Sequence, residues 1–346
     1  MMKKTRKSSE QLGRAKDPSG FLKSLVQAGL KNRIFLIIII AVLALVLFGT
    51  MPFMIGVDSF FIYYLFMVFI YIVVSQGWNL IGGYTGQVSL GTHAFFALGG
   101  YTTALIWLHD ITHTWYYFDP LVMALSGVVP AIFAIIIGIP TLSRLRGDYF
   151  SFGTLAAAQI LQIVILRTTA FSGGAVGLRL PAGGFTDLGR YYWTALLLVV
   201  LAVVAVYAIT KSRIGLALRA ISEDEMSAAS HGIHILKYKL LAFIIGSFII
   251  GVCGSLFAYY QFIVNPSSMM SLDRWMFYPL LICVLGGNGT IMGPIIGAFI
   301  VVTLFTFGEN LVGRVHPMLS GILIILVMKF MPTGIWGLKD KISPRR

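Results

Sequence analysis

Apolar runs long enough to cross the roughly 30 Å hydrocarbon core of a bilayer recur along the whole chain of 346 residues. There are ten of them, although the third is long and the eighth is short for a membrane span. They cover residues 34–55, 59–76, 79–108, 120–141, 149–168, 191–210, 239–261, 274–287, 291–309 and 316–332. Continuous apolar runs of this length satisfy their backbone in lipid as helices, so the sequence predicts an all-α polytopic membrane helical bundle.

The composition excludes most classes of soluble protein. The chain is 58% hydrophobic and only 11% charged, whereas soluble domains are about 25% charged. A water-soluble enzyme or a nucleic-acid-binding domain therefore does not fit, despite a formal net charge of +13. Cys253 and Cys283 lie inside apolar runs, and no cysteine or histidine cluster has metal-ligand spacing, so we expect packing residues and no metal or cofactor.

The basic residues divide unequally when the ten spans alternate across the membrane. With both termini on one face, that face holds 21 of the 26 lysines and arginines, and the acids divide almost evenly, so the two faces have formal charges of +14 and −1. Such an excess marks the cytoplasmic side. The sequence thus predicts a basic cytoplasmic tail (1–33), a transmembrane domain (34–332) and a cytoplasmic C-terminal tail (333–346). The longest outward loop, 168–190, is rich in turn residues and is predicted to be irregular.

Several function classes lack the residues that they need. No Asp or Glu lies near the middle of a predicted span, which disfavours a carrier driven by protons. Backbone carbonyls can also hold sodium, so a secondary carrier or facilitator stays open as an alternative. The chain has no Gly-Lys dipeptide and hence no phosphate-binding loop, so any ATP must be bound by another subunit. No catalytic constellation supports a membrane enzyme.

The start of the third run, from Gln76 to His93, is rich in glycine and polar residues. Lipid cannot satisfy such groups, so the segment should face protein or a wet cavity. It could pack closely against another helix, or it could be a discontinuous helix that lines a translocation path. A partial echo, with Gly286-Gly287 in place of Gly82-Gly83, favours the second interpretation. The candidate path residues are Trp78, Asn79, Gly82, Gly83, Gln87, Ser89, His93, Gln159, Gln162, Gly286, Gly287 and Asn288.

The longest inward loop, 211–239, contains the signals of a short helix. Ser222 and Glu225 have the spacing of a capping box, in which Ser222 is the N-cap and Glu225 reaches back. Gly232 is placed to end the helix in a left-handed conformation. The predicted helix covers 223–231. Its apolar stripe would consist of Met226, Ala229 or Ser230, and Ile233.

A helix this short is marginal in water and needs a surface to pack against. It is either a connector on the protein's own cytoplasmic face or a docking helix for a soluble ATPase, in which case charged residues would fix its orientation. The candidate coupling residues are Arg219, Ser222, Glu223, Asp224, Glu225, Met226, Ala228 and Gly232.

Six separated motifs occur in a fixed order between Gly77 and Leu338. They are Gly77-Trp78-Asn79-Leu80, Arg144-Leu145-Arg146-Gly147, Ser212-Arg213-Ile214-Gly215 with Glu223-Asp224-Glu225, Gly232-Ile233, Leu285-Gly286-Gly287 with Gly293-Pro294, and Gly334 with Gly337-Leu338. In these motifs the chain resembles the LivM-type permease subunits of branched-chain amino acid ABC importers. Two departures are Ser227-Ala228, where the family usually has an alanine pair, and His231, where an apolar residue is common.

The resemblance implies a permease of the inner membrane that is not itself an enzyme. It also implies a homologous second permease subunit, two cytoplasmic ATP-binding subunits and an extracytoplasmic substrate-binding protein as partners, and assigns ATPase contact to the 211–239 loop. Relatives of the same architecture transport urea, short amides, nucleosides or sugars. The solute therefore stays open at this point, with urea or amides as the alternative to branched-chain amino acids.

Overall fold

The computed structural model describes residues 43–111, 119–145, 147–180 and 188–312, together with 322, 325, 329 and 334–337. The predicted N-terminal tail (1–33) and most of both the tenth span (316–332) and the C-terminal tail (333–346) lie outside these residues. The chain divides into two units, residues 1–56 and 57–346. The described part of the first unit is an apolar helix, Leu43–Ile55, within the first predicted span. All that follows concerns the second unit.

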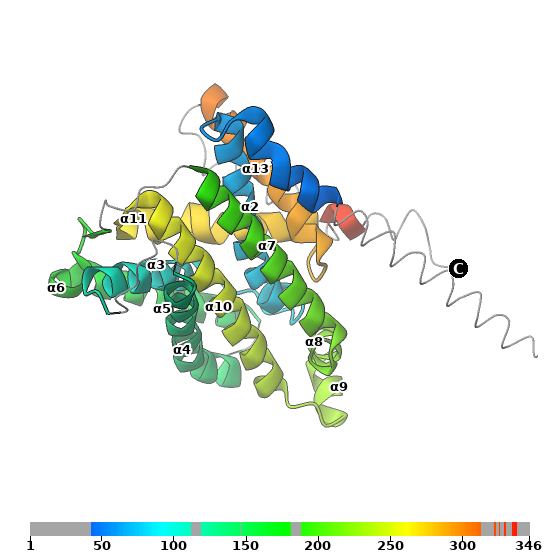
Figure 1. Ribbon diagram of the computed structural model, residues 1–346. Helices are drawn as coiled ribbons and strands as arrows, with labels where there is room; N and C mark the ends of the chain where they lie inside the picture. The colour runs from blue at the N-terminus through cyan, green and yellow to red at the C-terminus, as the bar shows by residue number, and fades with distance from the viewer. Residues whose placement is uncertain are drawn as a thin grey trace, which may run out of the picture. The chain divides into compact units, whose positions relative to one another are not determined.

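The second unit is built from helices, which Figure 1 shows with their labels. The long ones are α2 (Phe60–Gly82), α3 (Thr92–Leu108), α4 (Pro120–Arg144), α5 (Asp148–Arg167), α7 (Leu188–Lys211), α10 (Ile235–Gln261) and α13 (Met292–Val312). The shorter ones are α6 (Thr169–Ser172), α8 (Arg213–Glu223), α9 (Glu225–Ser230), α11 (Pro266–Met269), the π-helical turn η2 (Asp273–Phe277) and α12 (Tyr278–Gly286). Among the described residues, six helical stretches are long and apolar enough to cross a membrane. The predicted all-α, multi-pass membrane bundle is confirmed at this level.

The boundary predicted between the second and third spans is wrong. We placed an inward turn near residue 77 and a span over 79–108, but α2 continues to Gly82 and α3 begins at Thr92. The true connection is 83–91. Gly77 lies inside α2 and serves helix packing. A Cβ at Gly77 would lie 2.8 Å from the carbonyl oxygen of Gly246 in α10.

Helix α10 packs against α2, α3 and α4. Its glycines allow backbones to approach closely, as small residues do in membrane helices. A Cβ on Gly246 would lie 2.5 Å from the carbonyl oxygen of Gly77, and one on Gly251 would lie 2.8 Å from that of Ser126 in α4. Thr103 of α3 donates to Ser255 of α10 at 2.7 Å. The close-packing interpretation of the glycines is therefore right for Gly77.

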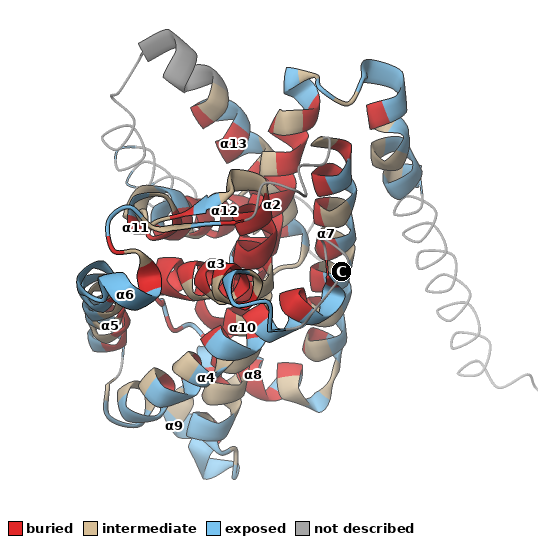
Figure 2. Cartoon of the chain, turned by 60° about the vertical axis from the view of Figure 1, so that its left-hand side comes forward, coloured by how far each residue is buried: buried red, intermediate tan, exposed pale blue. Residues whose placement is uncertain are grey.

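The burial pattern separates central helices from peripheral ones (Figure 2). Within the most apolar window of each helix, 78% of α2 is buried, compared with 28% of both α5 and α7. The exposed apolar side chains on α5 and α7 face lipid or another subunit, since water would not tolerate so many of them. Cys253 and Cys283 are free and buried, as expected for packing residues.

Two loops that the sequence places on the outward side pair with each other beside the C-terminal end of α10. Strand β1 (Leu178–Arg179) pairs antiparallel with β2 (Ile263–Val264), which follows α10 directly. Tyr191 of α7 donates to the carbonyl oxygen of Tyr259 at 3.1 Å. The prediction that 168–190 is simply irregular is therefore wrong, because α6 and β1 lie in it and the backbone partner of β1 is remote in sequence.

Candidate functional site

The 211–239 loop contains two helices, α8 and α9, where a single helix over 223–231 was predicted. Asp224 has an extended backbone and separates them. Its side chain, not that of Ser222, caps α9 by accepting from the backbone N–H groups of Met226 at 2.8 Å and Ser227 at 3.2 Å. Glu225 does not reach back as in a capping box. The predicted capping box is wrong because an acidic residue two positions later takes the N-cap role and Ser222 is absorbed into α8.

The predicted end of the helix is confirmed. Gly232 has φ +81°, in the left-handed region. Its N–H donates to the carbonyl oxygen of Ala229 at 2.9 Å, and the N–H of Ile233 donates to that of Ala228 at 3.1 Å. This pair of hydrogen bonds is the Schellman motif, which closes a helix and turns the chain toward α10.

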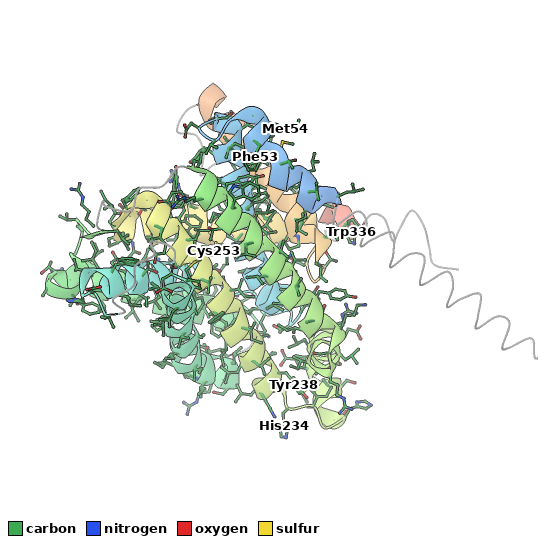
Figure 3. All side chains as sticks on the ribbon, in the orientation of Figure 1. Phe53, Met54, His234, Tyr238, Cys253 and Trp336 are labelled. Atoms are coloured by element: carbon green, nitrogen blue, oxygen red, sulfur yellow. The ribbon has the colours of Figure 1, made fainter. Side chains whose placement is uncertain are left out.

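Helix α8 is anchored to the bundle by an apolar cluster. Leu218 is buried with Leu80 of α2, Tyr84, Val206 of α7 and Ala242 of α10. Helix α9 therefore emerges from a fixed base. Figure 1 shows α8 and α9 at one end of α7 and α10, and Figure 3 places His234 and Tyr238 at that end, remote from Cys253.

The outer side of α9 is not covered by any described part of the chain. Met226 is 69% exposed, while Ala228 is only 4% exposed and faces inward. Ala229 and Ser230 are exposed and Ile233 is half-buried. The apolar stripe predicted for docking thus lies largely on the surface. The other candidate coupling residues Arg219, Ser222, Glu223 and Asp224 are also exposed.

The side chain of Glu225 in α9 forms an ion pair and a hydrogen bond with two segments outside the helix. Its Oε1 accepts from Lys239 Nζ in a short ion pair and from Gln87 Nε2 at 3.0 Å. Lys239 and Gln87 are both buried, with exposed fractions of 4% and 5%. Sequence reasoning placed Gln87 along the translocation path and gave Lys239 no role. The signal for Lys239 was its position four residues into a membrane helix, where a lysine needs a partner.

The connection 83–91 contacts α2, α5 and the α8–α9 pair. Trp78 Nε1 donates to the carbonyl oxygen of Ser89 at 2.8 Å, and Ser151 Oγ of α5 donates to that of Val88 at 2.6 Å.

Burial raises the pKa of Tyr84 to about 12, and the positive charge of Arg219 nearby opposes the rise only in part. Tyr84 therefore stays neutral.

The two predicted glycine segments lie against each other. Asn79 Nδ2 donates to the carbonyl oxygen of Thr290 at 2.8 Å, and its Oδ1 accepts from the N–H of Gly289 at 2.9 Å. A Cβ on Gly289 would lie 3.0 Å from the carbonyl oxygen of Gly83. Of the neighbouring residues in the two segments, Gly82, Gly286 and Gly287 are buried and Asn288 is exposed.

His93, at the start of α3, is fully buried, and neither ring nitrogen has a hydrogen-bond partner among the described residues. Gln159 and Gln162 of α5 are half-buried. The amide nitrogen of Gln159 is likewise without a partner in the described part of the chain. Asn79 and Ser89 are therefore engaged in protein contacts, whereas His93 and Gln159 retain unused polar atoms. Gln87 does both, since its Nε2 donates to Glu225 while its Oε1 is without a partner in the described residues.

Comparison with known proteins identifies the family of this chain. The sequence model of a family described as "Branched-chain amino acid transport system / permease component" matches residues 60–328. The chain belongs to this family. It is therefore a membrane transport subunit, a multi-pass protein of the cell membrane, in agreement with the sequence expectation that it is a permease and not an enzyme.

Individual members of the branched-chain amino acid permease family show the extent of the similarity. LivM, the high-affinity branched-chain amino acid transport system permease protein of Salmonella typhimurium, is 30% identical over 347 aligned positions, which cover 92% of this chain and 78% of the relative. A probable LivM of Methanocaldococcus jannaschii is 24% identical and covers 80% of this chain and 92% of the relative. LivH of Salmonella typhimurium is 32% identical over 45% of this chain and 49% of the relative. No solved structure matches the chain.

Proposed function

We propose that the chain is the LivM-like half of an ATP-driven importer of branched-chain amino acids, with ten spans and both termini in the cytoplasm. It pairs with a second, homologous permease subunit. Two ATP-binding subunits dock from the cytoplasm, and a substrate-binding protein delivers the solute from outside. The relatives are named as branched-chain amino acid permeases of both LivM and LivH types, which supports the solute class and the pairing.

The observation that best supports the topology is the meeting of loops at each end of the bundle. The connection 83–91 contacts the start of α5 through Ser151 and α9 through Gln87, and Asn79, near the end of α2, bonds to residues 289–290. Alternation of ten spans assigns all four segments to the cytoplasmic side. The β1–β2 pair joins two loops assigned to the opposite side. Helix α10, with 27 residues and therefore about 40 Å long, separates the two groups.

The exposed side of α9 supports the docking role. Met226 offers an apolar side chain to a groove, and Arg219 and Glu223 nearby are exposed charges that could pair with a partner and set its orientation. The inner side of the loop is anchored by Leu218 and Ala228. A loop fixed on one side and exposed on the other can transmit force from a bound subunit.

The path is proposed to run beside α3 and α5, where His93 and Gln159 offer unpartnered polar atoms to a solute. Buried polar groups normally have partners, so those without one in the described protein are candidates to bind what passes. The glycine segments around Gly83 and Gly287 form the cytoplasmic part of the path.

The test is purification of the tagged full chain with its partners, followed by uptake of labelled leucine into proteoliposomes. We expect two ATP-binding subunits to co-purify, uptake to require ATP and the binding protein, and valine and isoleucine to compete while urea and acetamide do not. Met226→Glu should lower the yield of the ATP-binding subunits. A stable homodimer that transports leucine without ATP would show a facilitator instead, and competition by urea alone would reassign the solute.

A further inference from the structure

Glu225 occupies a position where two remote segments meet on one carboxylate oxygen. Lys239 lies in the second turn of α10, and Gln87 lies in the connection between α2 and α3. Both donate to the same Oε1 of Glu225 in α9. The three side chains define what we call the Glu225 link. We infer that the Glu225 link is the mechanical connection by which movement of α9 reaches the glycine connection 83–91, and that Glu225 is its positioning residue.

Local stability does not account for this arrangement. Helix α9 already has an N-cap in Asp224 and a Schellman end at Gly232. Glu225 in the first turn could interact with the helix dipole from the solvent side. Instead its side chain turns inward to a lysine that is 4% exposed. Buried ion pairs are poor sources of stability compared with apolar packing, and they are better suited to fixing one geometry.

The Gln87 side of the link leads into the membrane part of the bundle. The segment around Gln87 is tied to α2 by Trp78 Nε1 on the Ser89 carbonyl at 2.8 Å. It is tied to α5 by Thr154 Oγ1, which accepts from the N–H of Leu90 at 3.1 Å. A displacement of Glu225 would therefore pull on α2 and α5 together through a contiguous set of hydrogen bonds.

The Lys239 side of the link leads into α10. This helix packs against α2, α3 and α4. The side chain of Lys239 is buried, so Glu225 cannot move outward without separating the two charges or moving the end of α10. Separation leaves a buried ammonium without a countercharge, which is costly. Movement of α9 and of α10 should therefore occur together.

The inference rests on the proposed function, because it assigns the link a task only if an ATP-binding subunit grips α9. Coupling is an energetic quantity, so it is measured directly. The measurement is the number of leucine molecules taken up per ATP hydrolysed by the reconstituted complex. Yield of the ATP-binding subunits is measured separately for every variant.

We expect Glu225→Gln and Lys239→Met each to lower the uptake per ATP by about tenfold, while the ATP-binding subunits still co-purify because the exposed side of α9 is unchanged. The charge swap Glu225→Lys with Lys239→Glu should recover much of the loss, as a double-mutant cycle requires for a direct pair. Lys237→Met is the matched control, since Lys237 is an exposed lysine two residues before Lys239, in the first turn of α10, and should leave the ratio unchanged.

Gln87→Leu tests the other side of the link without creating an unpaired charge in the bundle. We expect uptake per ATP to fall while Lys239 and Glu225 remain paired. Wild-type ratios in Glu225→Gln and Gln87→Leu would overturn the link while leaving the importer intact. A charge swap no better than the single variants would also overturn it. Failure of the wild-type chain to bind any ATP-hydrolysing subunit would instead overturn the proposed function, and the link with it.

Discussion

The side chain of Asn79 bridges the two glycine segments of the bundle, since it donates to the carbonyl oxygen of Thr290 at 2.8 Å and accepts from the N–H of Gly289 at 2.9 Å. Residues 210 positions apart in the chain are thus held together by one fully buried amide. An amide is suited to this position because it offers a donor and an acceptor to a backbone that has left regular structure.

Replacing Asn79 should therefore destabilise the protein. In Asn79→Leu, two partly buried backbone groups lose their partner, at a cost of about 1–3 kcal/mol each. We expect a clearly lower Tm in detergent, measured by thermal unfolding. Gln162→Leu is the matched control, because Gln162 is a half-buried amide on α5 that makes no such bridge to the described part of the chain. Equal Tm values for the two variants would show that the bridge contributes nothing.

The Schellman end of α9 makes a prediction about residue type. A Cβ on Gly232 would meet nothing within 4 Å, so the cost of Gly232→Ala comes from the left-handed backbone alone, about 1 kcal/mol. Asn tolerates this conformation better, so Gly232→Asn should cost less. Amide hydrogen exchange of α9 should quicken in the order wild type, Asn, Ala. The same exchange rate in Ala and Asn variants would mean that φ at this position is not constrained.

Close packing of α2 and α10 makes Gly246 sensitive to a single methyl group. In Gly246→Ala the new Cβ would lie 2.5 Å from the carbonyl oxygen of Gly77, so the helices must separate, at a cost of about 1–3 kcal/mol. In Gly153→Ala the nearest atom is the end of the Leu145 side chain at 2.9 Å, which can move. We expect a lower Tm for Gly246→Ala and an unchanged or higher Tm for Gly153→Ala. The reverse order would contradict the packing described.

His93 offers a test that separates transport from stability. Both ring nitrogens are buried without a partner in the described residues, so His93→Leu removes an unsatisfied polar group and should leave the Tm unchanged or raised. If the solute contacts the ring, loss of one hydrogen bond of about 1 kcal/mol should lower its apparent affinity by about fivefold to tenfold. Leucine uptake kinetics provide the measurement. Unchanged kinetics would make His93 a packing residue.

Much of the fold could be predicted because membrane insertion is a local property of sequence. A run of about 20 apolar residues identifies a helix without knowledge of its neighbours, and the loop charges indicate sidedness. The left-handed turn at Gly232 was also predictable, since it depends on residues adjacent in the chain. The continuation of α2 through Gly77 was not, because it depends on a glycine 169 positions later, Gly246, that lets the backbones touch.

The candidate site shows the same division between local and remote causes. The amino-acid sequence by itself determined that the chain forms a helical membrane bundle, that one loop contains a short capped helix, and that glycines and amides gather around residues 76–93. Only the tertiary structure decided which polar groups are paired. Glu225 is spaced for a capping box, yet it bonds to Lys239 and Gln87, because a buried lysine needs a countercharge more than a helix end needs a second cap. Hydrogen bonding of this kind depends on which helices lie side by side, and no local pattern of residues contains that information.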